Sequence, residues 1–285
     1  MSKRFLIVGA DAALGTALTG ELRARGHEVL TTSRRASGDG LLLDLEMDPA
    51  GWPSMPPDLN GAFIAAAMTS QKDCAANPAQ ARRINVEHTL TLIARLRDAR
   101  VGVVFPSTNL VLPCLAPTQS ADTPRRPMGL YATQKAEVEQ AAPDIAVCRL
   151  AKVLTPNTPI LLNWLHTLSQ GGSPRALTDL MIAPVSLPYA TAYLANLMEH
   201  GESGIWQMSG AAEISYFELA CELATHLGYE SGRILPARMA DSGVDSAAMP
   251  KHPSLDAQRA ECALGFAPQP LNAVVNDLIR GIPAA

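Results

Sequence analysis

A tyrosine and a lysine stand four residues apart near the middle of the chain, in the segment Tyr131 to Lys135. On a helix this spacing places both side chains on one face. An ammonium group beside a phenol favours the phenolate, so we expect Lys135 to lower the pKa of Tyr131. Such a tyrosine can exchange a proton with a carbonyl or alcohol oxygen. The same spacing also arises by chance on helix surfaces, so its meaning depends on where the pair lies.

Hydroxyl and amide side chains form the run Ser107, Thr108 and Asn109, directly after a short apolar stretch. If that stretch is a strand of a parallel sheet, these side chains lie in the crevice where doubly wound folds bind ligands. Thr108 and Asn109 are then candidate substrate contacts. Ser and Thr are also common turn residues, which is the alternative interpretation.

A glycine turn near the start of the chain runs from Gly9 to Gly15. A dinucleotide-binding fold needs glycine there, because the turn is tight and the pyrophosphate approaches the helix N-terminus closely. Ala12 adds a methyl group beside that phosphate path and is expected to weaken cofactor binding. A glycine after a strand can also be a simple turn. The candidate cofactor-binding residues of this segment are Gly9, Asp11, Ala12, Ala13, Leu14 and Gly15.

Ser33, Arg34 and Arg35 follow the second apolar run of the chain. An acidic residue in this place would bind the ribose hydroxyls of NAD, whereas an arginine accommodates the additional phosphate of NADP. The pair of arginines therefore favours NADP over NAD as the cofactor. The alternative is a solvated basic turn.

Lys152 follows the sixth expected strand and is a further candidate substrate contact. At that position a side chain points toward the crevice beyond the sheet, where an unpaired ammonium group calls for an anion. The alternative is that its stem packs on the protein while its ammonium group reaches solvent.

Hydrophobic periodicity predicts the elements that position these side chains. Short apolar runs indicate strands at residues 5–8, 29–32, 41–43, 62–67, 101–105 and 145–150. Helical spacing of apolar residues indicates helices at residues 14–26, 78–97 and 131–141. Strands that alternate with helices predict a parallel sheet with right-handed crossovers. The proline-rich stretch 49–57 is excluded from regular structure.

The pattern loosens in the second half of the chain. It predicts short strands near Ala176 and Ile205 and helices at residues 160–168, 188–199, 216–227 and 271–280. We therefore expect an α/β fold, a Rossmann doubly wound parallel sheet with a smaller mixed substrate-binding domain. Residues 1–152 are the expected NADP-binding domain. Residues 153–285 are expected to be mainly substrate-binding, with roughly 183–208 returning to the Rossmann core.

Taken together, these features resemble the extended short-chain dehydrogenase/reductases, the NAD-dependent epimerase/dehydratase group. The resemblance runs nearly end to end. Its motifs are the turn 9–15, the strand segment 62–67, Asn77-Pro78, Asn85-Val86, the Y-x-x-x-K-x-x-x-E segment 131–139, Arg149-Leu150 and the segment 264–268.

The resemblance implies a role for each matching residue. Tyr131 would be the acid/base, Lys135 its partner and a ribose anchor, and Thr108 the residue that bonds the substrate oxygen. Asn85 would support the active-site region. The further cofactor contacts implied by position are Asp44, Leu45, Ala65, Ala66, Ala67 and Asn85.

Within the group, residues 107–111 are similar to the STDYV segment of dTDP-4-dehydrorhamnose reductases, with Asn109 in place of the Asp. Residues 179–186 resemble the D…PTS stretch of the same enzymes. Dehydratases of the group carry an Asp-Glu pair after the threonine, so Asn109-Leu110 argues against dehydration through such a pair. Lys152 stands where many epimerases have Asn, which argues against the pocket of a common UDP-galactose epimerase.

Composition limits the remaining possibilities. The chain has 285 residues and a formal net charge of -4, which argues against a general nucleic-acid binder. The five cysteines and six histidines show no metal-ligand spacing, so we expect free thiols, no metal and a cytoplasmic location. Asp11 interrupts the early apolar run, which argues against a secretory signal, and no run is apolar enough for a membrane helix.

The leading hypothesis is an NADP-dependent oxidoreductase that reduces a carbonyl on a nucleotide-activated sugar or similar small molecule. A nucleotide-sugar epimerase could use the same residues, although Arg34 and Arg35 disfavour the retained NAD typical of epimerases in this group. A non-catalytic NADP-binding regulator is the third hypothesis, and the Tyr131–Lys135 pair argues against it. A homodimer formed through the helices near Asn85 and Tyr131 is expected from the resemblance.

Overall fold

The computed structural model describes residues 2–34, 40–242 and 249–282. Seven strands form one central sheet: β1 (Arg4–Val8), β2 (Glu28–Ser33), β3 (Leu41–Leu42), β4 (Gly61–Ile64), β5 (Gly102–Thr108), β6 (Ala146–Leu150) and β11 (Gly204–Met208). Their order is β11-β6-β5-β4-β1-β2-β3, and each neighbouring pair is parallel. The order reverses at β1 and β4, which is the arrangement that places a ligand crevice at the carboxyl ends of these strands.

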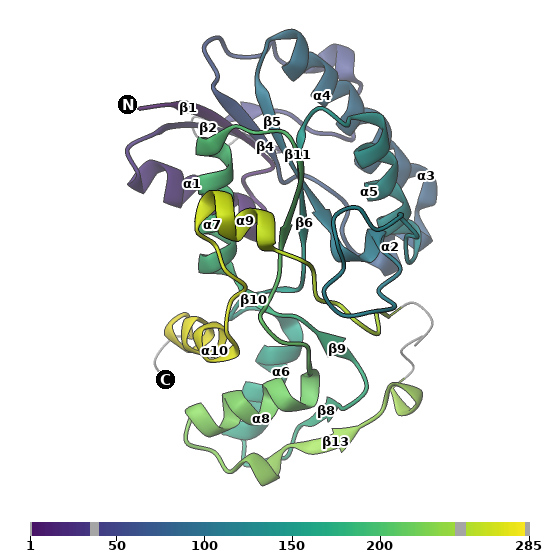
Figure 1. Ribbon diagram of the computed structural model, residues 1–285, viewed down its shortest axis with the longest axis vertical. Helices are drawn as coiled ribbons and strands as arrows, with labels where there is room; N and C mark the ends of the chain where they lie inside the picture. Colours follow the sequence, from purple (N-terminus) through teal and green to yellow (C-terminus); the bar gives the residue numbers. More distant parts are fainter. Residues whose placement is uncertain (1, 35–39, 243–248, 283–285) are drawn as a thin grey trace.

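Helices cover both faces of the sheet (Figure 1). One face carries α1 (Ala13–Ala24) and α7 (Leu187–His200), and the other carries α3 (Pro78–Arg82), α4 (Thr89–Asp98) and α5 (Leu130–Ala141). Side chains of a strand alternate between faces. Phe5 and Ile7 therefore pack in the α1–α7 layer, whereas Leu6 and Val8 pack with α4. The expected doubly wound α/β fold is confirmed.

Several boundaries differ from the sequence-based expectation. The expected strand 62–67 ends at Ile64, because the amide groups of Ala65 and Ala66 both donate to the carbonyl oxygen of Val8. The expected helix 78–97 consists of α3, a π-helical stretch (Arg83–His88) and α4. Strand β5 extends to Thr108, which pairs with Leu150 of β6. The short helices α2 (Gln71–Ala76) and α9 (Gln258–Leu264) were not anticipated.

The second half of the chain builds a smaller body below the carboxyl ends of the sheet strands (Figure 1). Its core is an apolar cluster that contains Trp164, Tyr216 and Val274. Its helices are α6 (Pro159–Ser169), α8 (Tyr216–His226) and α10 (Leu271–Arg280). Three short strand pairs accompany them: β7 (Val153–Leu154) with β10 (Val185–Ser186), β9 (Met181–Ile182) with β12 (Ile214–Ser215), and β8 (Arg175–Leu177) with β13 (Leu235–Ala237).

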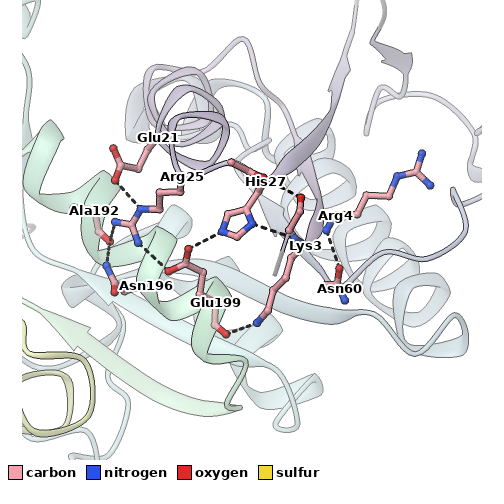
Figure 2. Close-up of polar contacts among 11 residues, drawn as sticks. Lys3, Arg4, Glu21, Arg25, His27, Asn60, Ala192, Asn196 and Glu199 are labelled. Atoms are coloured by element: carbon pink, nitrogen blue, oxygen red, sulfur yellow. Dashed lines mark hydrogen bonds and ion pairs between the residues drawn. The ribbon is translucent and has the colours of Figure 1, made fainter.

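A polar cluster fastens α7 to the first two elements at the opposite end of the sheet (Figure 2). The carboxylate of Glu199 on α7 accepts from Arg25 Nη1 at 2.9 Å and from His27 Nε2 at 2.6 Å. The Lys3 amide donates to His27 Nδ1 and the Lys3 ammonium donates to the Glu199 carbonyl oxygen. Burial raises the pKa of Glu199, but the bonds from His27 and Arg25 outweigh it and leave this pKa below its ordinary value. Residues 187–208 thus pack with the sheet although they follow the first six strands in sequence.

Within the described residues, no helix has both the length and the apolar character that a bilayer span requires.

Candidate active site

The glycine turn after β1 brings three segments into very close contact. Gly9 has a φ of +83°, and a Cβ atom on it would lie 2.6 Å from the backbone nitrogen of Ala66. A Cβ atom on Gly15 would lie 2.6 Å from the carbonyl oxygen of Gly9. Only glycine fits at either position. A Cβ atom would overlap the backbone of the neighbouring segment, which is Ala66 for Gly9 and the Gly9 carbonyl group for Gly15, and packed backbone cannot move aside.

Helix α1 begins at this turn and presents its N-terminus to the crevice. Ala12 precedes the helix and provides no side-chain cap. The amide groups of a helix's first turn carry partial positive charge and lack intrahelical partners, so they can bind an anion. This turn therefore fits the pyrophosphate of a dinucleotide, with the Ala12 methyl group beside it.

Two cavities meet at this turn. The larger, of about 600 Å³, is lined by Thr108, Asn109, Tyr131, Lys135 and Lys152, among others. The smaller, of about 290 Å³, lies over the ends of β2 and β3 and is lined in part by Asp11, Arg34, Ala66, Asp44 and Leu45. Both share Ala12, Ala65 and Ala67. An elongated ligand lying across the glycine turn can thus extend into both cavities.

The structure gives the other predicted cofactor residues different surroundings. Ser33 donates its hydroxyl to the Asp11 carboxylate at 2.7 Å. Leu14 lines the larger cavity. Ala13 and Gly15 lie in the first turn of α1. Arg35 lies outside the described residues.

Asn85 lies behind the cavity and supports its wall. Its Oδ1 accepts from the Met68 amide at 2.8 Å, and its Nδ2 donates to the Met68 carbonyl and to Gln134 Oε1. These bonds fix the loop after β4 against α5. The residue therefore acts on the site through the loop that carries Ala65 and Ala67.

Tyr131 and Lys135 lie one turn apart at the start of α5, as their spacing predicts. The Lys135 ammonium group donates to the Pro106 carbonyl oxygen at 2.8 Å. The same nitrogen lies 4.2 Å from the centre of the Phe105 ring and 5.7 Å from that of Tyr131. The end of β5 thus holds the lysine in place while both residues line the larger cavity.

The predicted direction of the Tyr131 pKa is wrong for this structure. Burial raises the pKa of the phenol, and the Cys74 thiol raises it further. Burial also lowers the pKa of Lys135 to about 7, although Glu139 opposes this shift. The lysine is therefore only partly charged at neutral pH, and desolvation of the phenolate is the main cause of the raised Tyr131 pKa. Tyr131 accordingly keeps its proton, which suits a proton donor.

Thr108 is placed at the carboxyl end of β5, in the cavity wall. Its Oγ1 accepts from the Leu110 amide at 3.2 Å and donates to Asn109 Oδ1 at 3.3 Å. Asn109 Nδ2 in turn donates to the Pro253 carbonyl oxygen at 2.9 Å. Asn109 therefore ties the segment around Pro253 to the end of β5, and both lie in the cavity wall.

A buried ion pair stands behind these residues. Arg149 Nη2 lies 2.8 Å from Glu139 Oε2, and the two side chains are 1% and 0% exposed. Ser107, beside Thr108, donates its hydroxyl to the same carboxylate. The spacing of Lys135 and Glu139 places both on one face of α5. The ion pair thereby fixes α5 relative to the ends of β5 and β6.

The far wall of the cavity comes from the second half of the chain, and sequence analysis did not find it. Its residues are Leu180, Met181, Ile182, Tyr216, Met249, Pro250 and Pro253. These residues share no local motif. They meet because β9, β12 and the segment 249–253 converge on the sheet edge. Lys152, which was anticipated, lines the same cavity.

Comparisons with known proteins agree with this fold. The family described as RmlD substrate binding domain matches residues 3–282. No match was found among curated proteins.

Solved structures of similar fold include three described as dTDP-4-dehydrorhamnose reductases. One, from Bacillus anthracis in complex with NADP, has a TM-score of 0.83 and 17% identity and covers 98% of this chain and 99% of its own. One from Yersinia enterocolitica has a TM-score of 0.80 and 17% identity. Its match covers 99% of this chain and 100% of the Yersinia chain. A hypothetical dTDP-4-dehydrorhamnose reductase from Sulfolobus tokodaii has a TM-score of 0.77 and 24% identity. Its match covers 91% of this chain and 94% of the Sulfolobus chain. Since the family match spans nearly the whole sequence, the chain belongs to the RmlD substrate binding domain family, among the extended short-chain dehydrogenase/reductases.

Proposed function

We propose that the protein is an NADP-dependent reductase of a carbonyl group on a small molecule, with nucleotide-activated sugars as the class that its family implies. The observation that carries this proposal is the meeting of Thr108, Tyr131 and Lys135 in one cavity that is continuous with the glycine turn. A dinucleotide along the turn and a carbonyl beside Tyr131 would then share one crevice.

The chain's own residues supply the proton and the binding. When bound, the nicotinamide cofactor supplies hydride. The carbonyl oxygen accepts a hydrogen bond from Tyr131 Oη and, once the Thr108 hydroxyl turns its proton away from Asn109 Oδ1, a second one from Thr108 Oγ1. Both bonds stabilise the negative charge that develops on this oxygen. Tyr131 then transfers its proton to that oxygen, and the Lys135 ammonium group stabilises the phenolate that forms. Hydride addition and proton transfer together convert the carbonyl to an alcohol.

Turnover assays test the proposal directly. The purified chain is incubated with NADPH and a panel of carbonyl compounds that includes a dTDP-4-keto-6-deoxyhexose, and loss of NADPH is followed by absorbance. We expect consumption of NADPH in equal amount to the alcohol formed, identified by mass spectrometry. NADPH binding without reduction of any carbonyl would instead support the non-catalytic regulator.

Replacement of Arg34 tests the cofactor preference. Hydrogen bonds to charged groups contribute about 1.5–3 kcal/mol. We therefore expect Arg34→Ala to weaken NADP binding about tenfold to a hundredfold and to leave NAD binding nearly unchanged. Fluorescence titration with both cofactors measures this, and NAD serves as the matched control. Equal losses for the two cofactors would contradict the assignment of Arg34 to the additional phosphate.

A further inference from the structure

Tyr216 differs in chemistry from every other described side chain on the far wall of the larger cavity. The side chains of the other residues on this wall are apolar, namely Leu180, Met181, Ile182, Met249, Pro250 and Pro253. Tyr216 begins α8, directly after β12, and its backbone amide donates to the Leu180 carbonyl oxygen at 3.2 Å. Pairing of β12 with β9 thus places one phenol in a wall that is otherwise apolar.

The ring of Tyr216 is buried, whereas its hydroxyl opens onto the cavity. Only 7% of the residue is exposed, and its ring packs edge to face with Trp164 at a centroid distance of 6.1 Å. The hydroxyl has no hydrogen-bond partner within the described residues. It is also not sealed from solvent, since the described side-chain atoms that are buried without a partner are Gln119 Oε1 and Gln134 Nε2. What Tyr216 exposes therefore faces the cavity that it lines.

Packing does not require this hydroxyl. A phenylalanine would fill the same space in the apolar cluster around Trp164 and keep the ring contact. Burial raises the pKa of Tyr216 to about 12, so at neutral pH the hydroxyl keeps its proton and can both donate and accept. Solvent serves it until a ligand fills the cavity. A ligand that displaces this solvent has to offer a polar atom in its place, because a buried hydroxyl without a partner is unfavourable.

A hydroxyl group matches the phenol, because it too both donates and accepts. A sugar ring carries hydroxyls beside its carbonyl carbon, so a sugar whose carbonyl lies at Tyr131 can present one to the far wall. We propose that Tyr216 binds a ring hydroxyl of the sugar substrate and thereby selects hydroxylated over deoxygenated sugars. This inference rests on the proposed function and names a specificity-determining residue in the same cavity.

The test pairs one substrate hydroxyl with one side chain. The full chain and NADPH are supplied with a dTDP-4-keto-6-deoxyhexose and with its 2-deoxy and 3-deoxy analogues. For the parent chain we expect one analogue to lose about fivefold to a hundredfold in kcat/KM, because the Tyr216 hydroxyl is then left unpaired. Tyr216→Phe should lower kcat/KM for the complete sugar and show no further loss with that analogue. Such non-additivity identifies a direct contact between the two groups.

Tyr229→Phe is the matched control. Tyr229 packs against the same apolar cluster but lines neither cavity, so this variant should discriminate between the sugars as the parent does. Both variants keep their rings, and urea denaturation without ligand should give a free energy of unfolding close to the parental value. Parental discrimination in Tyr216→Phe would overturn the inference. An equal loss of affinity for dTDP alone and for all three sugars would also overturn it, since it would place the contact on the nucleotide.

Calorimetry separates this inference from the proposed function. The chain saturated with NADP is titrated with a dTDP-6-deoxyhexose and its deoxy analogues, which carry no ketone to reduce. A loss of affinity on removal of one hydroxyl, absent in Tyr216→Phe, would support the role of Tyr216 even if no carbonyl is reduced, and that combination would overturn the reductase. Reduction of the keto sugar without any such coupling would support the reductase and overturn the role of Tyr216. Failure of every one of these sugars to bind would overturn the inference as well.

Discussion

The Tyr131→Phe variant should lose about 10²–10⁴-fold in kcat for carbonyl reduction, because it removes the proton donor. The ring remains in place, so the Kd of NADPH should stay within about twofold of the parent value. Tyr189→Phe is the matched control. Tyr189 lies on α7, where its hydroxyl donates to the Ala267 carbonyl oxygen away from both cavities, so its loss should leave kcat unchanged. Steady-state kinetics with NADPH measure both variants, and a Tyr131→Phe variant with parental kcat would exclude Tyr131 as the proton donor.

The pH profile of the parent chain tests the same step. Burial lowers the pKa of Lys135 to about 7 and raises that of Tyr131. As pH rises through about 7, Lys135 loses its proton and no longer stabilises the developing phenolate. We therefore expect kcat for reduction to fall as pH rises, and Lys135→Met to abolish that dependence. A kcat that rises across this range would contradict the assigned role of the lysine.

Loss of one member of the buried Glu139–Arg149 pair should have the largest effect on stability. Removing one partner of such a pair typically costs about 3–5 kcal/mol, because the other charge stays buried without its main counter-charge. Arg125 lies 3.5 Å from Glu139 and offsets part of this loss in the Arg149 variant. We expect this loss in the free energy of unfolding for Glu139→Gln and for Arg149→Met, measured by urea denaturation. Both variants should also lose activity, because Ser107 beside Thr108 bonds to the Glu139 carboxylate.

An exposed ion pair provides the control for this measurement. Arg97 and Asp144 lie 2.8 Å apart with about half of each side chain exposed, at 48% and 49%. Asp144→Asn should cost no more than about 1 kcal/mol, because solvent screens the pair. A Glu139→Leu and Arg149→Met double variant should recover much of the stability that either single change loses. A loss at Glu139 no larger than that at Asp144 would show that the buried pair contributes little.

The sequence determined the sheet and the part of the site that belongs to it. Apolar runs at strand length, separated by helical periodicity, allow few arrangements other than a parallel doubly wound sheet. The carboxyl ends of its strands meet in one crevice, so the sequence alone predicts that Gly9, Thr108 and Tyr131 lie together. Local patterns sufficed because each of these residues lies at a fixed offset from a strand or on one helix face.

Protonation depended on the tertiary structure. The spacing of Tyr131 and Lys135 predicted a lowered tyrosine pKa, because it showed the neighbouring charge and not the burial of both groups. Desolvation depends on every element that covers a side chain, and here it reverses the expected shift. The same applies to Asn85, whose partners Met68 and Gln134 come from other segments of the chain.

Tertiary structure also decided which residues form the far wall of the larger cavity. Met181 lies in a two-residue strand and Met249 in a loop, and neither belongs to a periodic pattern. They line the same cavity as Tyr131 only because the smaller body packs against the carboxyl ends of the strands. Contacts between residues so far apart in sequence leave no local signal. The sequence therefore determined the fold and the placement of Thr108, Tyr131 and Lys135 at the crevice, whereas packing of the second half of the chain decided what lies opposite them.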